Sequence, residues 1–496
     1  MHKNIILVLT ILLYLLGFIF SYPTIYDNLF GDEKLDSIRN FFEYGMMFCS
    51  FLVFNAFLFK NKYTSVISIV LILLLSLNFL ISVSCFFVYQ SGFNTGMAIS
   101  ILESNVHEVF SMSYMFILPG ILFVLFFVMQ VYSANYLKKV IANNFKFGVL
   151  ASLWLIMPFM FFLKHKYVSN KGGGSIIKNV CYHFSDFENA LKIQEDISII
   201  KTNIPVFDIK KIQPGIQNVI LIIGESERKQ NMSLYGYAKK TTPFTDRETK
   251  NMMIFDNAVS PAGITNLSVP LMLSSIDPGE FEEHYSKLSN NIINLANQNK
   301  YHTFWISTQA SAKGITAIAS MAKEKKWING YDDVIVPELK NTVKLNKEMF
   351  TVMHIMGSHP NPCNRLPKDW NSDGLDCYDS SIKYKDYVMG QIFSSLRNTN
   401  SVVIYVSDHG LKIKDDKLLH VDSKESTQVP FFVWYGDKVP QNYRVTGNIK
   451  EITQTTFIYP LIMKFMGLET PKHYKNEQNK YLNLSMKSID YKELAD

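Results

Sequence analysis

Ionisable side chains follow three short apolar runs of the chain, each just after the run ends. The runs are Val219–Ile223, Phe350–Ile355 and Ser401–Val406, and the side chains that follow them are Glu225, His359, Asp408 and His409. Short, bounded apolar runs are typical of buried strands in an α/β sheet, and ligands bind beyond the carboxyl ends of such strands. Carboxylate oxygens and imidazole nitrogens are donors that zinc and similar cations prefer. The three runs therefore predict a metal site.

A hydroxyl-rich segment, residues 260–275, lies between the first two of these runs. Its hydroxyl side chains are Ser260, Thr265, Ser268, Ser274 and Ser275. Polar clusters of this kind usually form turns and helix N-caps. A helix N-terminus also binds anions, and a bound metal can make a hydroxyl there a nucleophile. The residue pattern does not choose among these hydroxyls.

The elements that must position these side chains follow residue 214. Apolar runs alternate there with helical patterns, including a helix over Ile292–Gln298, a strand over Thr303–Ile306 and a helix over Tyr384–Leu396. Such alternation predicts a mostly parallel sheet covered by helices on both faces.

The first third of the chain is rich in Phe, Leu and Ile and nearly free of charge. It contains five apolar segments: Asn4–Tyr22, Glu43–Phe59, Thr64–Tyr89, Ser111–Tyr132 and Phe147–Leu163. Each is about the ~17–25 residues that cross a bilayer as a helix. The first has no clear signal-peptidase site and four similar segments follow it, so we interpret it as a retained anchor.

Lysines in the short loops predict the orientation of these segments. One side carries Lys3, Lys60, Lys62, Lys138, Lys139 and Lys146, and is therefore expected to be cytoplasmic. Five crossings then place everything after Leu163 outside the cytoplasm. Helical spacing within residues 91–110 predicts a helix along the membrane surface. We expect a transmembrane domain at residues 1–165, a linker with an amphipathic helix at 166–213, and a catalytic domain at 214–496.

Charge and cysteines limit the function classes further. The net charge of +6 is modest and dispersed, which indicates no nucleic-acid partner. Cys363 and Cys377 share one polar loop of the exported domain, where an oxidising compartment would allow them to pair. Cys49 and Cys85 lie in apolar segments, and the sequence offers Cys181 no partner.

The order of the motifs resembles the bacterial phosphoethanolamine transferases, a group within the alkaline phosphatase/sulfatase superfamily. The matching stretches are GESERKQNMSLYGYAKKTTPF, TNLSVPLMLS, SAKG, HIMGSHP, YDSSIKYKDYV, SDHG, and LLH followed by QVPFFVW. The resemblance implies five transmembrane helices followed by an α/β periplasmic domain of alkaline phosphatase/sulfatase-like fold. It also implies a multi-pass protein of the bacterial inner membrane, and we expect a monomer.

The resemblance also implies roles for particular residues. Glu225, Thr265, Asp408 and His409 resemble the zinc ligands, and Thr265 would be the nucleophile. The residues matching those that contact the phosphoryl group are His359, His420 and Lys313. One zinc ion is expected, and a second is left open. The chain departs from many relatives in two places: Pro261 and Leu271 replace a cysteine pair, and Gln309 replaces an asparagine.

The implied reaction moves phosphoethanolamine from phosphatidylethanolamine to a surface glycolipid or glycan, with lipid A or the lipopolysaccharide core favoured. Thr265 would carry the phosphoethanolamine as a covalent intermediate. One alternative is a transferase of phosphoglycerol or another lipid headgroup on the same fold. A second is an inactive, membrane-tethered binding protein. A sulfatase is disfavoured because no C/S-x-P-x-R motif occurs near Thr265.

Overall fold

The computed structural model describes residues 2–21, 34–89, 93–103, 110, 113–143, 146, 149, 186–192, 195, 204–281, 288–309, 313–414, 417–469 and 480–496. The chain forms two compact units. The first is Met1–Asn94 with Met112–Glu188, and the second is Thr95–Ser111 with Asn189–Asp496. The expected catalytic domain at 214–496 falls within the second unit, which also includes a segment from the N-terminal third.

The first unit consists of helices joined by short turns in the part that the structure describes. Its helices are α1 (His2–Ser21), α3 (Lys34–Leu58), α4 (Lys62–Ser84), the π-helix η1 (Cys85–Tyr89), the 3-10 helix η2 (Ser113–Phe116) and α7 (Ile117–Asn143). Among the residues that the structure describes, two stretches are long and apolar enough to cross a membrane, Lys62–Val88 and Ser113–Asn143. Two shorter apolar helices are Asn4–Gly17 and Gly45–Leu58. The fifth predicted segment lies outside the described residues.

Small and polar side chains connect these helices. Gln130 on α7 donates to Ser76 Oγ on α4 over 2.8 Å, and Ser68 on α4 donates to Asn55 on α3 over 2.7 Å. Hydrogen bonds of this kind hold helices together where no water competes. Large apolar side chains such as Val66, Leu74 and Val128 are exposed on the same helices. Apolar surface on the outside and polar contacts between helices are what a bilayer environment requires.

The second unit contains one sheet of eight strands in the order β10-β2-β9-β6-β1-β5-β3-β4. The strands are β1 (Asn218–Gly224), β2 (Met252–Val259), β3 (His302–Ser307), β4 (Glu324–Trp327), β5 (Met349–His354), β6 (Ser401–Ser407), β9 (Phe431–Tyr435) and β10 (Gly447–Gln454). Only β9 runs antiparallel to its neighbours β2 and β6 among these strands. The prediction of a mostly parallel sheet is confirmed, and so are its four named strands.

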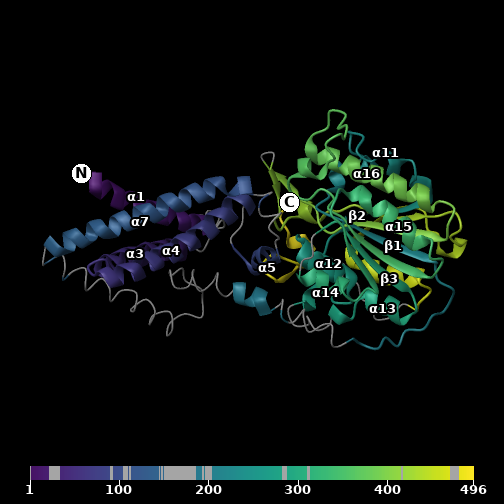
Figure 1. The fold of residues 1–496 in the computed structure, drawn as a ribbon, viewed down its shortest axis with the longest axis horizontal. Helices are drawn as coiled ribbons and strands as arrows, with labels where there is room; N and C mark the ends of the chain where they lie inside the picture. Colours follow the sequence, from purple (N-terminus) through teal and green to yellow (C-terminus); the bar gives the residue numbers. More distant parts are fainter. Residues whose placement is uncertain are drawn as a thin grey trace. The chain divides into compact units, whose positions relative to one another are not determined.

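Helices cover both faces of this sheet (Figure 1). One face carries α11 (Pro243–Asp246), α15 (Ile335–Val343) and α16 (Cys377–Leu396), and the other carries α12 (Thr265–Leu273), α13 (Ile292–Gln298) and α14 (Lys313–Ala319). The predicted helix over Tyr384–Leu396 begins earlier, at Cys377, because Asp376 caps it by accepting from the Asp379 backbone N–H. Further helices are α17 (Lys424–Thr427) and α18 (Ile458–Phe465). Every residue of β1, β5 and β6 is buried, as the apolar runs predicted.

Three smaller features complete the second unit. The helix predicted within residues 91–110 is α5 (Thr95–Glu103), which has Met97 buried and Ile101 exposed and packs against α12. Two hairpins pair β7 (Lys412–Lys414) with β8 (Lys417–Leu419), and β11 (Lys480–Leu482) with β12 (Ser488–Asp490). The predicted linker helix is described only at residues 186–192 and 195, where it is helical.

The cysteine predictions are also resolved in part. Cys363 and Cys377 form a disulfide with an S–S distance of 2.00 Å, as their shared loop suggested. Cys49 and Cys85 are free thiols on the helices of the first unit. Cys181 lies outside the described residues.

Candidate active site

The three strands that the sequence singled out are neighbours in the sheet. β1 lies between β5 and β6, with Ile223 opposite His354 and Gly224 opposite Ser407. Because all three run in parallel, their carboxyl ends share one edge. Glu225, Asp408 and His409 therefore emerge side by side.

Tight backbone packing explains the glycines at this edge. A Cβ atom at Gly224 would lie 2.2 Å from Tyr405 Oη, and one at Gly357 would lie 2.8 Å from the backbone nitrogen of Glu225. Gly357 also has a φ of +49°, which L-residues rarely adopt. Ser226 has a φ of +58° without being glycine, and such strain clusters at functional sites. The close backbone packing at this edge of the sheet thus requires the glycines of the Gly-Glu-Ser and Met-Gly-Ser-His motifs.

Two buried carboxylates and one imidazole form the centre of the site. His409 Nε2 lies 3.4 Å from Glu225 Oε1 and 3.4 Å from Asp408 Oδ2. Asp408 Oδ1 accepts from the backbone N–H groups of Ser226 and His409, at 3.1 and 2.8 Å. Asp408 Oδ2 has no hydrogen-bond partner among the described residues. This buried oxygen depends on the charge of His409, whose Nε2 lies 3.4 Å away, for its compensation.

The hydrogen bond on the far side of His409 determines its tautomer. Nδ1 lies 2.8 Å from the backbone oxygen of Gly410, and a carbonyl oxygen can only accept. In the neutral ring, Nδ1 therefore carries the proton, and the lone pair of Nε2 points toward Glu225 and Asp408. Metal-binding histidines are oriented by the same kind of outer contact.

The structure distinguishes among the hydroxyls of residues 260–275. Thr265, the first residue of α12, places Oγ1 3.0 Å from Glu225 Oε2 and 3.3 Å from His409 Nε2. Ser260 and Ser268 instead donate to the backbone oxygen of Asp408, at 2.6 and 2.5 Å, and are buried. Thr265 is partly exposed. Of these three hydroxyls, that of Thr265 is therefore the one that lies in the cluster, on a residue that is only partly buried.

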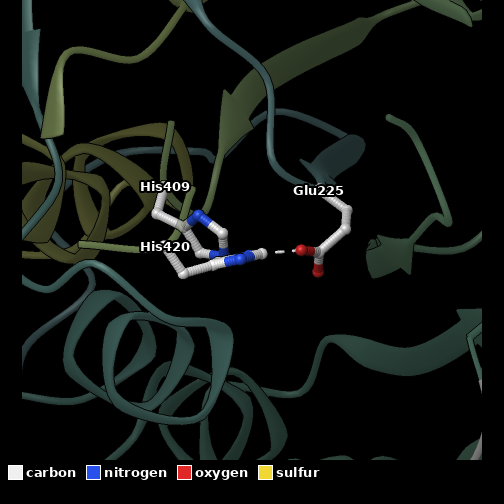
Figure 2. A group of neighbouring side chains, drawn as sticks. All are labelled: Glu225, His409 and His420. Atoms are coloured by element: carbon white, nitrogen blue, oxygen red, sulfur yellow. Dashed lines mark ion pairs between the residues drawn. The ribbon is translucent and has the colours of Figure 1, made fainter. Parts of the chain in front are cut away.

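The remaining predicted residues surround this centre to different degrees. His420 joins Glu225 and His409, with one donor atom of each lying within 4.8 Å of the others (Figure 2). His359 lies near enough to the centre that a positive charge on its ring would contribute to lowering the pKa of Glu225. Lys313 is the first residue of α14, and its side chain lies outside what the structure describes.

The electrostatics of the cluster favour a cation. Burial raises the pKa of Asp408 to about 7, and the negative charge of Glu225 adds to this. Burial would lower the pKa of His409, but the charges of Asp408 and Glu225 raise it to about 9. Burial also opposes ionisation of Glu225, yet the hydrogen bond and charge of His409 hold the pKa of Glu225 well below its usual range. Without a metal, the His409 imidazolium supplies the positive charge that two buried carboxylates need.

The donor set also suits a zinc ion. Two carboxylates, an imidazole with its lone pair directed inward, and a hydroxyl meet at one point, and one carboxylate oxygen there is unsatisfied. Zinc binds oxygen and nitrogen donors of this kind in four-coordinate sites. Figure 2 shows the Glu225 carboxylate directed toward the rings of His409 and His420.

Two residues take part that sequence reasoning did not assign to the centre. Gln309, noted only as a departure from the family, donates its amide N–H to Glu225 Oε2 over 3.0 Å and to the Ile355 backbone oxygen over 2.9 Å. Arg365 donates to His359 Nδ1 over 3.1 Å, so the neutral His359 ring carries its proton on Nε2. Nothing in the composition of the loop after His359 identified Arg365. The only signal was its position between the two paired cysteines.

Comparisons with known proteins match both parts of the chain. The sulfatase family model matches residues 217–468, and the N-terminal domain model of the transferase YhbX matches residues 5–173. YhbX of Escherichia coli K12, named as a transferase, is 31% identical over 452 residues, which cover 82% of this chain and 81% of YhbX. Phosphoethanolamine transferase EptA of Helicobacter pylori 26695 is 26% identical over 447 residues, which cover 79% of this chain and 81% of EptA.

Two solved structures share the fold. The integral membrane lipooligosaccharide phosphoethanolamine transferase A of Neisseria meningitidis superposes with a TM-score of 0.64 at 17% identity, covering 96% of this chain and 97% of that one. The C-terminal periplasmic domain of EptC from Escherichia coli, solved in complex with zinc, gives a TM-score of 0.50 at 20% identity, covering 58% of this chain and 97% of that one. The predicted alkaline phosphatase/sulfatase-like fold of the second unit is confirmed.

Proposed function

Because the chain belongs to the sulfatase family and carries the N-terminal domain of the YhbX transferases, we propose that it is a zinc-dependent phosphoethanolamine transferase. Its donor would be phosphatidylethanolamine, and its acceptor a hydroxyl or phosphate of a surface glycolipid or glycan, with lipid A or the lipopolysaccharide core favoured. The name of its Helicobacter pylori relative, a phosphoethanolamine transferase, supports the transferred group. The position of the Thr265 hydroxyl against Glu225 and His409 supports the chemistry.

We further propose that the protein is a multi-pass protein of the bacterial inner membrane with residues 214–496 in the periplasm. The two apolar stretches Lys62–Val88 and Ser113–Asn143 support membrane insertion. The lysines of the predicted cytoplasmic loops support the orientation. A disulfide between Cys363 and Cys377 is consistent with an oxidising compartment. Both substrates would be lipids or lipid-linked, so anchoring the enzyme replaces free diffusion with local encounter.

The metal-binding residues would be Glu225, Thr265, Asp408 and His409. His420, one donor atom of which lies within 4.8 Å of donor atoms of Glu225 and His409, would contact the phosphoryl group or hold a second ion. When bound, zinc would lower the pKa of the nucleophile and neutralise charge on the phosphoryl oxygens. Glu225 holds the Thr265 hydroxyl in place through its Oε2 atom. His359, whose proton is on Nε2, can donate to a phosphoryl oxygen or to the leaving group. Lys313 would contact the substrate phosphate.

The reaction divides into two transfers through Thr265. In the first, Thr265 Oγ1 loses its proton and bonds to phosphorus, the bond from phosphorus to the glycerol oxygen breaks, and diacylglycerol leaves with a proton. In the second, an acceptor oxygen loses its proton and bonds to phosphorus, and the Thr265 oxygen leaves and regains a proton. Atoms and charge balance, and no oxidant or reductant is required. The free enzyme is restored after each cycle.

Replacement of the nucleophile tests this proposal. Thr265→Ala should abolish release of diacylglycerol from a fluorescent phosphatidylethanolamine while the protein still folds, because a nucleophile accounts for most of the rate. Thr265→Ser should retain partial activity, since the attacking oxygen remains and only rotamer restriction is lost. Ser268→Ala should lose far less, because that hydroxyl donates to the Asp408 backbone.

Two results would contradict the assignment. Normal turnover by Thr265→Ala, together with an inactive Ser268→Ala, would show that the nucleophile is wrongly identified. Intact-mass analysis of the wild type should show added phosphoethanolamine after exposure to the donor lipid. An adduct formed from phosphatidylglycerol instead would favour the phosphoglycerol alternative, and no adduct with any lipid would favour a binding protein.

A further inference from the structure

Residues 480–484, which we call the strap, lie against two loops of the candidate active site. The strap includes β11, and it lies outside residues 217–468, which the sulfatase family model matches. One loop it contacts, residues 261–263, leads directly into Thr265. The other loop it contacts, residues 420–424, begins at His420. These loops are more than 150 residues apart in the sequence and meet at the strap.

A single buried hydroxyl in the strap touches both loops. Tyr481 is fully buried and donates from Oη to Asp422 Oδ1 over 2.8 Å. The same oxygen interacts with the backbone of Gly263. A Cβ atom at Gly263 would lie 2.7 Å from Tyr481 Oη, so the hydroxyl lies directly against the glycine. Gly263 is two residues before the proposed nucleophile, and Asp422 is two residues after His420.

Backbone contacts hold the strap on each side of this hydroxyl. The Leu482 N–H donates to the Pro261 oxygen over 2.8 Å. The Leu484 N–H donates to both carboxylate oxygens of Asp422, at 3.2 and 3.1 Å. The Gly96 N–H, at the start of α5, donates to the Leu484 oxygen over 3.1 Å. The strap is therefore anchored to the nucleophile loop, the His420 loop and α5 together.

We propose that the strap, through Tyr481 and Asp422, sets the separation of Thr265 from His420. The inference rests on the proposed role of Thr265 as the nucleophile. Tyr481 contacts loop residues rather than the Thr265 hydroxyl, so it is a positioning residue. The hydroxyl acts as a spacer, since it contacts Gly263 on one side and Asp422 on the other. Reacting groups displaced by about 1 Å can lose about 100-fold in rate.

Removing this hydroxyl from the full-length enzyme is the first test. Tyr481→Phe should lower kcat about 10-fold to 100-fold for the fluorescent phosphatidylethanolamine, with KM and zinc content little changed. The matched control is Tyr443→Phe, which removes a tyrosine hydroxyl bonded to the Pro214 oxygen elsewhere in the same unit. The control should keep the wild-type kcat. A role in stability alone would lower the melting temperature without a selective loss of kcat.

The second test uses the contact with Gly263. Gly263→Ala should impair turnover because the new methyl group meets Tyr481 Oη at 2.7 Å. The next nearest atoms to that Cβ are the Val421 oxygen at 3.6 Å and Asp422 Oδ1 at 4.0 Å, so the methyl fits once the hydroxyl is removed. Gly263 does not have a left-handed φ, so alanine suits its backbone. The double variant Gly263→Ala/Tyr481→Phe should therefore match Tyr481→Phe alone.

The outcomes separate this inference from the proposed function. Wild-type kcat for Tyr481→Phe, in an enzyme that Thr265→Ala inactivates, would overturn the strap and leave the function intact. Losses that add in the double variant would also overturn it, because the two residues would then act independently. Failure of Tyr481→Phe to fold would assign the hydroxyl to stability and refute a positioning role. Suppression of the Gly263→Ala defect by Tyr481→Phe would support it.

Discussion

The amide of Gln309 orients the Glu225 carboxylate, and its removal should weaken zinc binding. Gln309 Nε2 donates to Glu225 Oε2 over 3.0 Å and to the Ile355 oxygen over 2.9 Å. The same Glu225 oxygen accepts from Thr265. Gln309→Leu keeps most of the side-chain volume and removes both bonds. Glu225 then keeps its charge but loses the contact that fixes its orientation from the side of β3.

The size of the effect follows from the type of contact. A hydrogen bond to a charged group contributes about 1.5–3 kcal/mol. Loss of an outer contact to a metal ligand typically weakens metal binding by about 10–100-fold, or roughly 1.4–2.7 kcal/mol by the tenfold rule. We therefore expect the zinc Kd of Gln309→Leu to rise by about 10–100-fold. Turnover at saturating zinc should recover in large part, because every proposed ligand is still present.

Competition with a fluorescent zinc chelator measures this Kd on the purified full-length protein. Gln217→Leu is a matched control, since the Gln217 amide donates to the Asn346 side chain at a half-exposed position. Glu225→Gln serves as a positive control that should lose most of the zinc affinity. A Kd for Gln309→Leu within twofold of the wild type, beside a clear loss in Glu225→Gln, would refute the reasoning. Glu225 would then be oriented by other contacts.

Two further predictions concern the surroundings of the site. The double variant Cys363→Ser/Cys377→Ser removes a cross-link between residues 14 apart, which stabilises the fold by about 3 kcal/mol through loop entropy. We expect a lower melting temperature because this cross-link is lost, and a lower kcat because the closed loop carries Arg365. Unchanged values of both would contradict this. Burial lowers the pKa of His354 from 6.5 to about 4, so the unfolded chain binds more protons between those pH values. The contribution of His354 to stability should be constant above pH 6.5 and fall by about 3 kcal/mol toward pH 4. Denaturant unfolding of His354→Asn should show a weaker pH dependence between pH 4 and 6.5, and an identical dependence would show that His354 is not responsible.

The fold was accessible from sequence where the relevant signal is local. Short apolar runs identified β1, β5 and β6, because buried parallel strands need apolar side chains on both faces. The residues after those runs identified Glu225, Asp408 and His409. The order of the strands was not predictable, because β1 pairs with β5 and β6 across more than 120 residues. The hydroxyl-rich segment was ambiguous because the sequence does not show which of its hydroxyls faces Glu225. Thr265 does so from the first position of α12, whereas Ser260 and Ser268 bond to the backbone oxygen of Asp408.

Residues that act through distant partners were not assigned to the site from the sequence. Gln309 bonds to Glu225 across 84 positions, and Tyr481 bonds to Asp422 across 59. Neither glutamine nor tyrosine is unusual in its own segment, so no local pattern distinguishes these two from structural residues. Arg365 lies between the disulfide-bonded Cys363 and Cys377, and it contacts His359 Nδ1. Such contacts become visible only when the sheet brings the loops together.

The position of α5 bears on how this enzyme can be studied. Sequence patterns assigned residues 95–103 to the N-terminal, membrane-spanning half, because they lie between two apolar helices. The structure places them in the second unit, where Met97, Ala98 and Ile99 are buried and α5 packs against α12. The Gly96 N–H, at the start of α5, also donates to the backbone oxygen of Leu484 in the strap. A fragment starting at residue 214 would lack α5, and it would therefore expose the surface of α12 against which α5 packs. Low stability or low activity of such a fragment would therefore reflect the loss of α5 from the catalytic unit as well as the loss of the membrane anchor.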